Sequence, residues 1–398
     1  MKQFAIYVTG ILFLTTLMGC EGFFGVKTST DFLDEPQFDQ REVAYVPIQP
    51  VWDDMEYPVD IIAGWDELIY VADSVSEEII SFDQAGNELG RYSVPGLSSI
   101  AQDRSLDILA VGTFDTTINN RDFTLSTIYR IDLNKGGDYG LENAFIENKI
   151  VHPFYFRTGV PDDNEQFVRF RGIAALADGE YYVTRNGPDT NPQKFGGPDD
   201  ALLIFNKEDV FLTPMAIVTE IGTFRNFFRQ PQGLATFAQP PQSPVIDQGK
   251  DFYFTSISPT NALKVQRIVE VIGPFGSNFE VGAFQTGDTS LSDRFLLEGF
   301  RFDKPVDVTV AGDGTNYFWV VDEARDSVYQ FTGRGFEGVN PPPGSSSDKV
   351  IRVSFGGKGI GLTQFNKPRA VAYIDQILYV ADGGNGRILR FKLTTDFD

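Results

Sequence analysis

The stretch FNKPRAVAYIDQILYVADGGNGRILRF, residues 365–391, contains three short apolar runs that are rich in β-branched and aromatic residues. Asp375-Gln376 separates the first run from the second, and residues 383–386 (GGNG) separate the second from the third. Runs of this composition between turn residues predict three antiparallel strands. Such a small sheet cannot bury both of its faces alone, so we expect it to be one unit of a larger array.

The same unit occurs twice more upstream, with its features in the same order. Each copy has a proline-led strand, a strand that ends in Asp, and a strand that ends in Phe. The copies are residues 304–308, 319–322 and 327–331, and residues 57–61, 70–73 and 79–82. Repetition of one supersecondary unit predicts an architecture in which neighbouring units cover each other's apolar faces.

This pattern resembles the NHL repeat, whose family builds β-propellers, usually six-bladed, from one four-stranded sheet per blade. Residues 365–391 match it closely, including Asn385-Gly386-Arg387-Ile388, and the other copies are looser. The resemblance implies an all-β fold, a six-bladed β-propeller of four-stranded antiparallel blades. It implies little about function, because one fold can carry many functions.

Weaker copies in the middle of the chain complete the six blades. Their inner, second and third strands are predicted at residues 99–101, 106–111 and 127–131, at 171–174, 181–184 and 202–205, and at 232–235, 252–255 and 265–268. Outer strands are predicted at residues 89–94, 215–221 and 350–355. The last repeat ends at Phe391 without a fourth strand, whereas residues 42–46 alternate like a strand. We therefore expect this N-terminal strand to close the last blade, which removes an exposed sheet edge.

Residues 1–19 have the features of a bacterial lipoprotein signal peptide. Lys2 precedes an apolar run, and Leu17-Met18-Gly19-Cys20 resembles a lipobox. The run is shorter than the ~20 apolar residues that span a bilayer, which favours a cleaved signal over a retained anchor. Cys20, the only cysteine, is then the expected lipid anchor, and no thiol remains for a disulfide or for catalysis. Residues 20–38 are interpreted as a tether and residues 39–398 as the propeller.

The composition and the motifs exclude several classes of function. A net charge of −22 disfavours nucleic acid and anionic membrane surfaces as partners. The sequence has no nucleophile elbow, metalloprotease helix, phosphate loop or cysteine pair. The single histidine, His152, cannot build a histidine-rich zinc site, and it is interpreted as a loop residue. We therefore expect no catalytic residue, no metal ligand and no cofactor.

Two carboxylates are expected at the central channel, where the inner strands begin. Asp60 and Asp307 occupy equivalent positions of two repeats. Calcium takes about six to eight oxygen ligands, so two carboxylates from separate blades are too few to assert a calcium site. We expect each Asp to accept hydrogen bonds from the backbone at the start of its strand.

Basic residues recur just before these positions at the start of the inner strands. Arg171, Lys304 and Arg369 fall near equivalent points of three repeats, and Gln232 takes this place in another. A ring fold would gather them on one rim, where they would attract a carboxylate, a sulfate or an acidic protein segment. We therefore interpret these four residues, together with Asp60 and Asp307, as candidates for ligand binding.

A structural interpretation of the same basic residues stays open. In repeats that resemble these, Lys or Arg beside the proline often pairs with the Asp that ends the second strand. The corresponding acids in this chain are Asp73, Asp322 and Asp382. Ion-pair networks and binding sites look alike in a sequence, so the pattern alone does not separate them.

Three functions are compatible with the sequence. Long insertions at residues 153–166, 186–199 and 273–300 suggest a loop-rich binding face. The favoured function is a non-catalytic, lipid-anchored protein of the bacterial outer membrane that binds a protein or glycan, similar to six-bladed propeller lipoproteins of Bacteroidota. The alternative is a calcium-dependent hydrolase or lactonase, which would need a ring of Glu, Asp and Asn in the channel. The third is a subunit of an outer-membrane complex, docked through the insertions.

Overall fold

A computed structural model of the protein describes residues 43–135, 137–152, 164–188, 200–224, 227–238, 249–274, 276–284 and 289–397. The described residues belong to one compact unit, Val43–Asp398. The predicted signal peptide at residues 1–19, the lipid anchor Cys20 and the tether at residues 20–38 lie outside them. Parts of the insertions predicted at 153–166 and 186–199 also lie outside.

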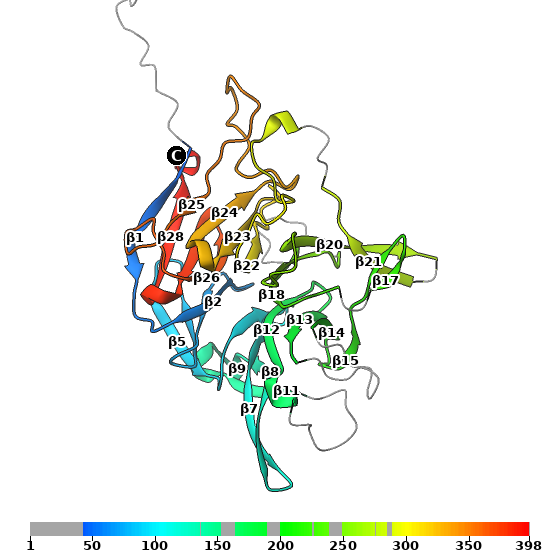
Figure 1. Cartoon of the computed structure of the whole chain (residues 1–398). Coiled ribbons are helices and arrows are strands. Elements are labelled where there is room, and N and C mark those ends of the chain that lie inside the picture. Colours follow the sequence, from blue (N-terminus) through cyan, green and yellow to red (C-terminus); the bar gives the residue numbers. More distant parts are fainter. Residues whose placement is uncertain are drawn as a thin grey trace, which may run out of the picture. The chain divides into compact units, whose positions relative to one another are not determined.

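The unit is a six-bladed β-propeller with four antiparallel strands in each blade, as predicted (Figure 1). Blade one comprises β2 (Pro58–Ala63), β3 (Ile69–Asp73), β4 (Glu78–Phe82) and β5 (Glu88–Ser93). Blade two comprises β6 (Ser99–Gln102), β7 (Ile108–Ile118), β8 (Arg121–Asp132) and β11 (Phe145–Val151). Blade three comprises β12 (Arg169–Ala175), β13 (Tyr181–Asn186), β14 (Ala201–Phe205) and β15 (Phe211–Pro214).

The second half of the ring repeats this order from inner to outer strand. Blade four comprises β18 (Pro231–Thr236), β19 (Phe252–Ser256), β20 (Val265–Gly273) and β21 (Gly276–Val281). Blade five comprises β22 (Pro305–Val310), β23 (Phe318–Asp322), β24 (Ser327–Phe331) and β25 (Phe355–Gly356). Blade six comprises β26 (Pro368–Ile374), β27 (Ile377–Asp382), β28 (Arg387–Leu393) and β1 (Tyr45–Trp52). Additional short elements are β9 (Asn134–Lys135), β10 (Asp138–Tyr139), β16 (Ile217–Thr219), β17 (Gly222–Phe224) and the 3₁₀ turns η2 (Leu141–Asn143), η3 (Glu165–Phe167), η4 (Thr289–Leu291), η5 (Glu323–Arg325), η6 (Gly383–Asn385) and η7 (Thr394–Asp396). Each inner strand contacts the inner strands of both neighbouring blades, so the ring is closed.

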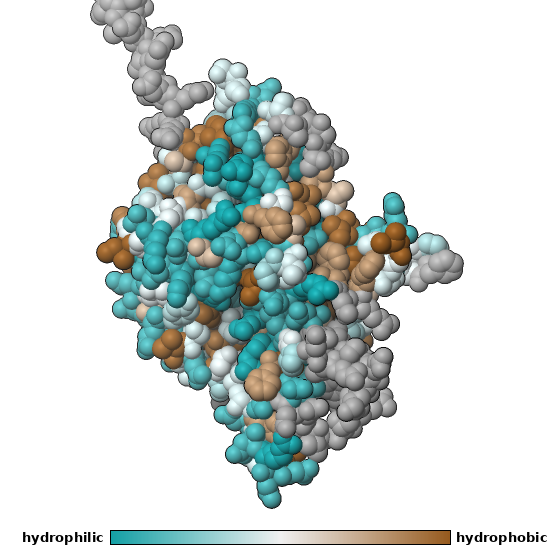
Figure 2. Space-filling model, in the orientation of Figure 1, coloured by the Kyte–Doolittle hydropathy of each residue, from teal (hydrophilic) through white to brown (hydrophobic). Residues whose placement is uncertain are grey.

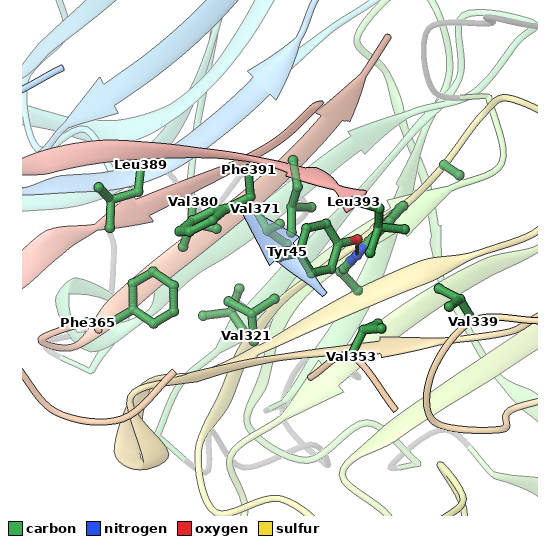
Figure 3. Packing of buried hydrophobic residues seen from close by; sticks show 14 of the residues in the cluster. Tyr45, Val321, Val339, Val353, Phe365, Val371, Val380, Leu389, Phe391 and Leu393 are labelled. Carbon is green, nitrogen blue, oxygen red and sulfur yellow. Dashed lines mark hydrogen bonds between the residues drawn. The ribbon is translucent and has the colours of Figure 1, made fainter. Parts of the chain in front are cut away.

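The N-terminal strand closes the ring, as the sequence predicted. β1 pairs antiparallel with β28, from Tyr45 opposite Leu393 to Trp52 opposite Ile388, so it extends beyond the predicted residues 42–46. The Tyr45 hydroxyl accepts a hydrogen bond from Trp319 Nε1 (2.8 Å) and donates one to Gln330 Oε1 (2.8 Å), both in blade five. Figure 3 shows Tyr45 in the apolar core that blades five and six share. The closing strand therefore also ties its own blade to the preceding one.

The core consists of apolar layers between neighbouring blades. Six clusters of described residues each combine side chains from two successive blades. The middle strands β3, β19 and β23 are buried at every position, because sheets cover both of their faces. Strands covered on both sides read as continuous apolar runs, and bulky aromatic rings fill the space between the sheets.

Two predicted outer strands are misplaced, and one predicted insertion contains an outer strand. The outer strand of blade three is β15, before the predicted residues 215–221, and that range instead holds β16, which joins the sheet of blade four with β17. Residues 273–300, predicted as an insertion, contain β21, the outer strand of blade four. The outer strand of blade five is Phe355–Gly356, whereas most of the predicted 350–355 is not in the sheet. Outer strands face solvent, so an apolar pattern does not mark them.

Polar residues cover most of the surface in the view of Figure 2, and an apolar patch lies over β17 and β21. Ile221, at the turn between β16 and β17, and Ile272, near the end of β20, are 87% and 81% exposed. Phe224, Val271 and Val281 of the same strands are exposed as well, so these side chains are not isolated.

Candidate functional site

The inner strands carry an irregularity at the same place in five blades. The register with the second strand shifts between Pro58 and Asp60, Phe170 and Ile173, Pro231 and Leu234, Pro305 and Asp307, and Pro368 and Ala370. A β-bulge redirects side chains and often lies beside a binding site. Consecutive residues of each bulge can therefore both line the central channel.

The channel holds a cavity of about 300 Å³ that all six inner strands line. Five of the six candidate residues belong to its wall, namely Asp60, Arg171, Gln232, Asp307 and Arg369. The sixth candidate, Lys304, does not line it. The repeat pattern thus placed five of these side chains around one space.

Asp60 joins blades one and two. Its carboxylate accepts hydrogen bonds from Ser99 Oγ (2.7 Å) and from the backbone N–H of Ile100 (2.8 Å), both on the inner strand of the next blade. It also accepts one from the N–H of Ile61 (2.8 Å). Burial raises the pKa of Asp60, and the hydrogen bonds oppose this shift. The expected bond to the backbone is present, and it connects two blades.

Asp307 joins blades five and six in the same way. Its carboxylate accepts a hydrogen bond from the N–H of Val371 (2.9 Å) on β26. Gly233 allows β18 to approach, because a Cβ there would lie 2.7 Å from the Asp307 Cα. Burial raises the pKa of Asp307 well above its usual value, and the charge of Asp60 raises it further.

The two channel carboxyls are a poor donor set for calcium. Both accept hydrogen bonds from neighbouring strands, which occupy oxygens that a metal ion would need. Within the described ranges, no group of three or more His, Cys, Asp or Glu side chains is arranged to hold a metal ion. Asp60 and Asp307 are the carboxylates of the described channel wall, far fewer than the about six to eight oxygens that calcium takes.

Two of the three predicted basic residues are paired with one acid that the sequence interpretation missed. Glu323 Oε2 lies 2.8 Å from Lys304 Nζ and 2.5 Å from Arg369 Nη1. Glu323 directly follows the Asp that ends the second strand of blade five, in the turn that faces the start of the inner strands. In the sequence, the signal for this acid was that Glu323 directly follows Asp322, the recurrent Asp position at the end of the second strand of the repeat.

The structural interpretation of the basic residues is wrong about their partners. The Asp residues that end the second strands accept backbone N–H groups of the loop before their own inner strand. Asp73 accepts from the N–H of Glu56 (2.6 Å), Asp322 from the N–H of Asp303 (2.7 Å) and Asp382 from the N–H of Asn366 (2.7 Å). These carboxylates are fully buried, so they satisfy loop amides that would otherwise lack partners.

Arg171 differs from the other two basic residues. Its side chain is exposed to the channel, and no hydrogen bond or ion pair engages its guanidinium group in the part of the chain that the structure describes. Burial between the channel walls lowers the pKa of Arg171, and the charges of Arg369 and Arg169 lower it further. Arg369 Nε is buried without a hydrogen-bond partner at the same channel. An anion between these guanidinium groups would relieve their repulsion.

Gln232 has a smaller role in the geometry of the channel. Its side-chain amide donates to the carbonyl of Pro231 (3.0 Å), and its backbone carbonyl accepts from Thr184 Oγ1 (2.8 Å) of blade three. A Cβ at Gly172 would lie 2.4 Å from that carbonyl, so glycine permits the close approach. This contact holds blades three and four together beside Arg171.

His152 is not an ordinary loop residue, and it lies away from the channel. The ring is completely buried and bonded through Nε2 to the Glu165 carboxylate, which is itself almost fully buried. Burial lowers the pKa of His152, and the Glu165 charge opposes this shift. The pair connects the end of β11 with η3.

Among the described residues, no helix is long and apolar enough to span a membrane.

The chain was compared with known proteins. No protein family matches it, and no curated protein is similar in sequence. Its fold is similar to a PQQ-bound aldose sugar dehydrogenase from Streptomyces coelicolor (TM-score 0.52, 13% identity, 88% of this chain and 98% of that chain covered). Others are a gluconolactonase from Xanthomonas campestris (0.49, 10%, 86% and 88%) and an auxiliary nutrient binding protein from Bacteroides thetaiotaomicron (0.48, 13%, 88% and 72%). Identities this low establish the fold alone.

Proposed function

We propose that this protein is a lipid-anchored, non-catalytic binding protein of the bacterial outer membrane. Its propeller would bind an acidic group of a protein or glycan partner at the channel mouth. The observation that carries this proposal is Arg171, a guanidinium group that is exposed to the channel and has no anionic partner among the described residues. A guanidinium group donates charge-assisted hydrogen bonds, and it binds a carboxylate or another anion most strongly.

The surroundings of Arg171 support an anionic ligand. The Asp60 and Asp307 carboxylates accept backbone hydrogen bonds from neighbouring strands, and no ion pair joins either of them to Arg171 among the described residues. The volume of about 300 Å³ is at the lower limit of the roughly 300–1,000 Å³ that is usual for ligand pockets. The channel would therefore take one acidic side chain or one acidic sugar of a larger partner.

Replacing Arg171 by Gln is expected to weaken binding of acidic probes by about tenfold, since a hydrogen bond to a charged group contributes more than 1 kcal/mol. The binding should also depend less on salt, because salt screens the lost attraction. We would titrate a poly-glutamate peptide and a galacturonic acid oligosaccharide at two ionic strengths.

Lys304→Gln is the matched control, because Lys304 lies outside the channel wall and is paired with Glu323. It should leave the affinity unchanged, and melting temperatures would confirm that both variants fold. Equal affinity of Arg171→Gln and the natural protein for every acidic probe would refute the proposed site.

Lipid attachment has a separate test. Residues 17–20 (LMGC) motivate the expectation that the mature chain begins at Cys20 and carries diacylglycerol on its sulfur. The intact mass of the protein extracted from membranes should include this modification, and a Cys20→Ser variant should lack it. A natural protein that retains residues 1–19 without lipid would contradict the anchor.

A further inference from the structure

Blade three carries a buried cation at a repeat position where three other blades carry a buried acid. Asp73, Asp322 and Asp382 each pair with the proline that begins the inner strand, directly before the register shift. The residue at this position of β13 is Arg185, which pairs with Phe170 of β12 directly before the same shift. One blade therefore reverses the charge of a buried side chain while the strand pairing around it stays the same.

The guanidinium group of Arg185 lacks hydrogen-bond acceptors. The side chain is 0% exposed, and its Nε, Nη1 and Nη2 atoms are all buried without a hydrogen-bond partner among the described residues. The Asp residues at the equivalent positions, in contrast, accept N–H groups of the loop before their inner strand. A charged group that is buried without partners is strongly unfavourable. The folded protein therefore needs an acceptor at Arg185 that the described part of the chain does not supply.

Two acids of the neighbouring segments are bonded to other groups. The Glu165 carboxylate is bonded to the ring of His152. Burial lowers the pKa of His152, and the charge of Arg185 also lowers it, so the guanidinium group lies near this pair. The Asp200 carboxylate accepts the N–H of Gly187 at 3.3 Å. Neither carboxylate is hydrogen-bonded to Arg185, so both leave its N–H groups without acceptors.

A glycine leaves a small apolar space beside the guanidinium group. A Cβ at Gly187 would lie 3.1 Å from Arg185 Nη1 and 3.2 Å from Val168 Cγ2. Glycine lacks this atom, so a position at contact distance from Nη1 is open to a group about as large as a methyl. Val168 and Phe170 are buried and apolar, and charges attract each other strongly between apolar walls because the dielectric constant is low there.

We propose that Arg185 holds a buried chloride ion at the junction of blades two and three. Chloride carries the single negative charge that balances a guanidinium group, and it accepts charge-assisted hydrogen bonds from several N–H groups at once. Its size is close to that of the missing methyl group, whereas phosphate and sulfate are larger and costlier to dehydrate. A water molecule would accept hydrogen bonds but leave the buried charge unbalanced. Arg185 is not part of the channel wall, so this site is separate from the one proposed at Arg171.

The test measures thermal unfolding of the intact protein in sodium chloride, bromide and gluconate at one ionic strength. The melting temperature should be about 2–4 °C higher in chloride or bromide than in gluconate, because an ion that binds only the folded state stabilises it and gluconate is too large to enter. Gly187→Ala should abolish this difference, since the added methyl group takes the place of the ion. Arg185→Met should abolish it as well. Lys207→Gln removes a cation that is 67% exposed, and as the control it should retain the difference.

Crystals soaked in bromide would locate the ion, and an anomalous scattering peak is expected beside Arg185 Nη1. Equal melting temperatures of the natural protein in the three salts would overturn the proposal. So would a difference that Gly187→Ala and Arg185→Met both retain, or a water molecule or an acidic side chain of this chain in place of bromide. Binding of acidic probes to Arg171→Gln concerns the channel alone, so the two proposals fail independently.

Discussion

A chain that lacks residues 43–52 is expected to lose its cooperative thermal transition and to aggregate. The deletion removes β1 and leaves the edge of β28 unpaired, and exposed edges template association. It also removes two buried aromatic residues, Tyr45 and Trp52, and the Trp52 ring stacks on Phe82 of blade one at 4.9 Å. Loss of a buried aromatic side chain costs about 3–5 kcal/mol, and a typical domain is stable by only about 5–15 kcal/mol.

Calorimetry and size-exclusion chromatography would measure this effect. The control is a deletion of residues 22–36, within the predicted tether, which should leave the melting temperature unchanged. The milder substitution Tyr45→Phe removes the hydroxyl group that bonds to Trp319 and Gln330. It should lower the free energy of unfolding by about 1–3 kcal/mol. If the chain tolerated both deletions equally, β1 would not be needed for closure.

The second large effect is expected from Asp382→Ala, at about 3–5 kcal/mol of unfolding free energy, the usual cost of breaking a buried ion pair. The Asp382 carboxylate is fully buried and accepts hydrogen bonds from the Asn366 N–H (2.7 Å), Asn385 Nδ2 (2.8 Å) and Arg387 Nε (2.8 Å). Without it, the guanidinium group of Arg387 would keep its charge in a nearly buried place with no acid.

Urea denaturation would measure the change in stability. Asp293→Ala is the matched control, because this carboxylate is 81% exposed and pairs with Lys349 on the surface at 2.6 Å. Exposed pairs contribute about 0–1 kcal/mol, so the control should change little. Similar small costs for both variants would show that the buried carboxylate is dispensable for stability.

The repeat could be recognised because its middle strands have no freedom in composition. Each second strand lies between two sheets, so β3 and β23 must be continuous apolar runs. The Asp at the end of such a strand must be there to accept loop amides, as Asp322 does. These requirements act within one blade, at short sequence separation, and they therefore leave a local pattern that predicted the blades.

The outer strands and insertions were harder to predict. β15 is a partly exposed edge strand of four residues, and backbone pairing rather than apolar side chains holds it. The more apolar residues that follow it instead pair with blade four through Ile217. A free sheet edge accepts almost any composition, so hydrophobic periodicity carries little information there.

The candidate site shows where local patterns stop being informative. Arg171, Lys304 and Arg369 look equivalent in the sequence, yet Glu323 neutralises the last two and leaves the first exposed. Arg369 and Glu323 are on different blades and 46 residues apart, so their pairing depends on how the ring closes. Repeats specify the blades through local burial, whereas charge pairing across blades depends on distances that exist only in the folded ring.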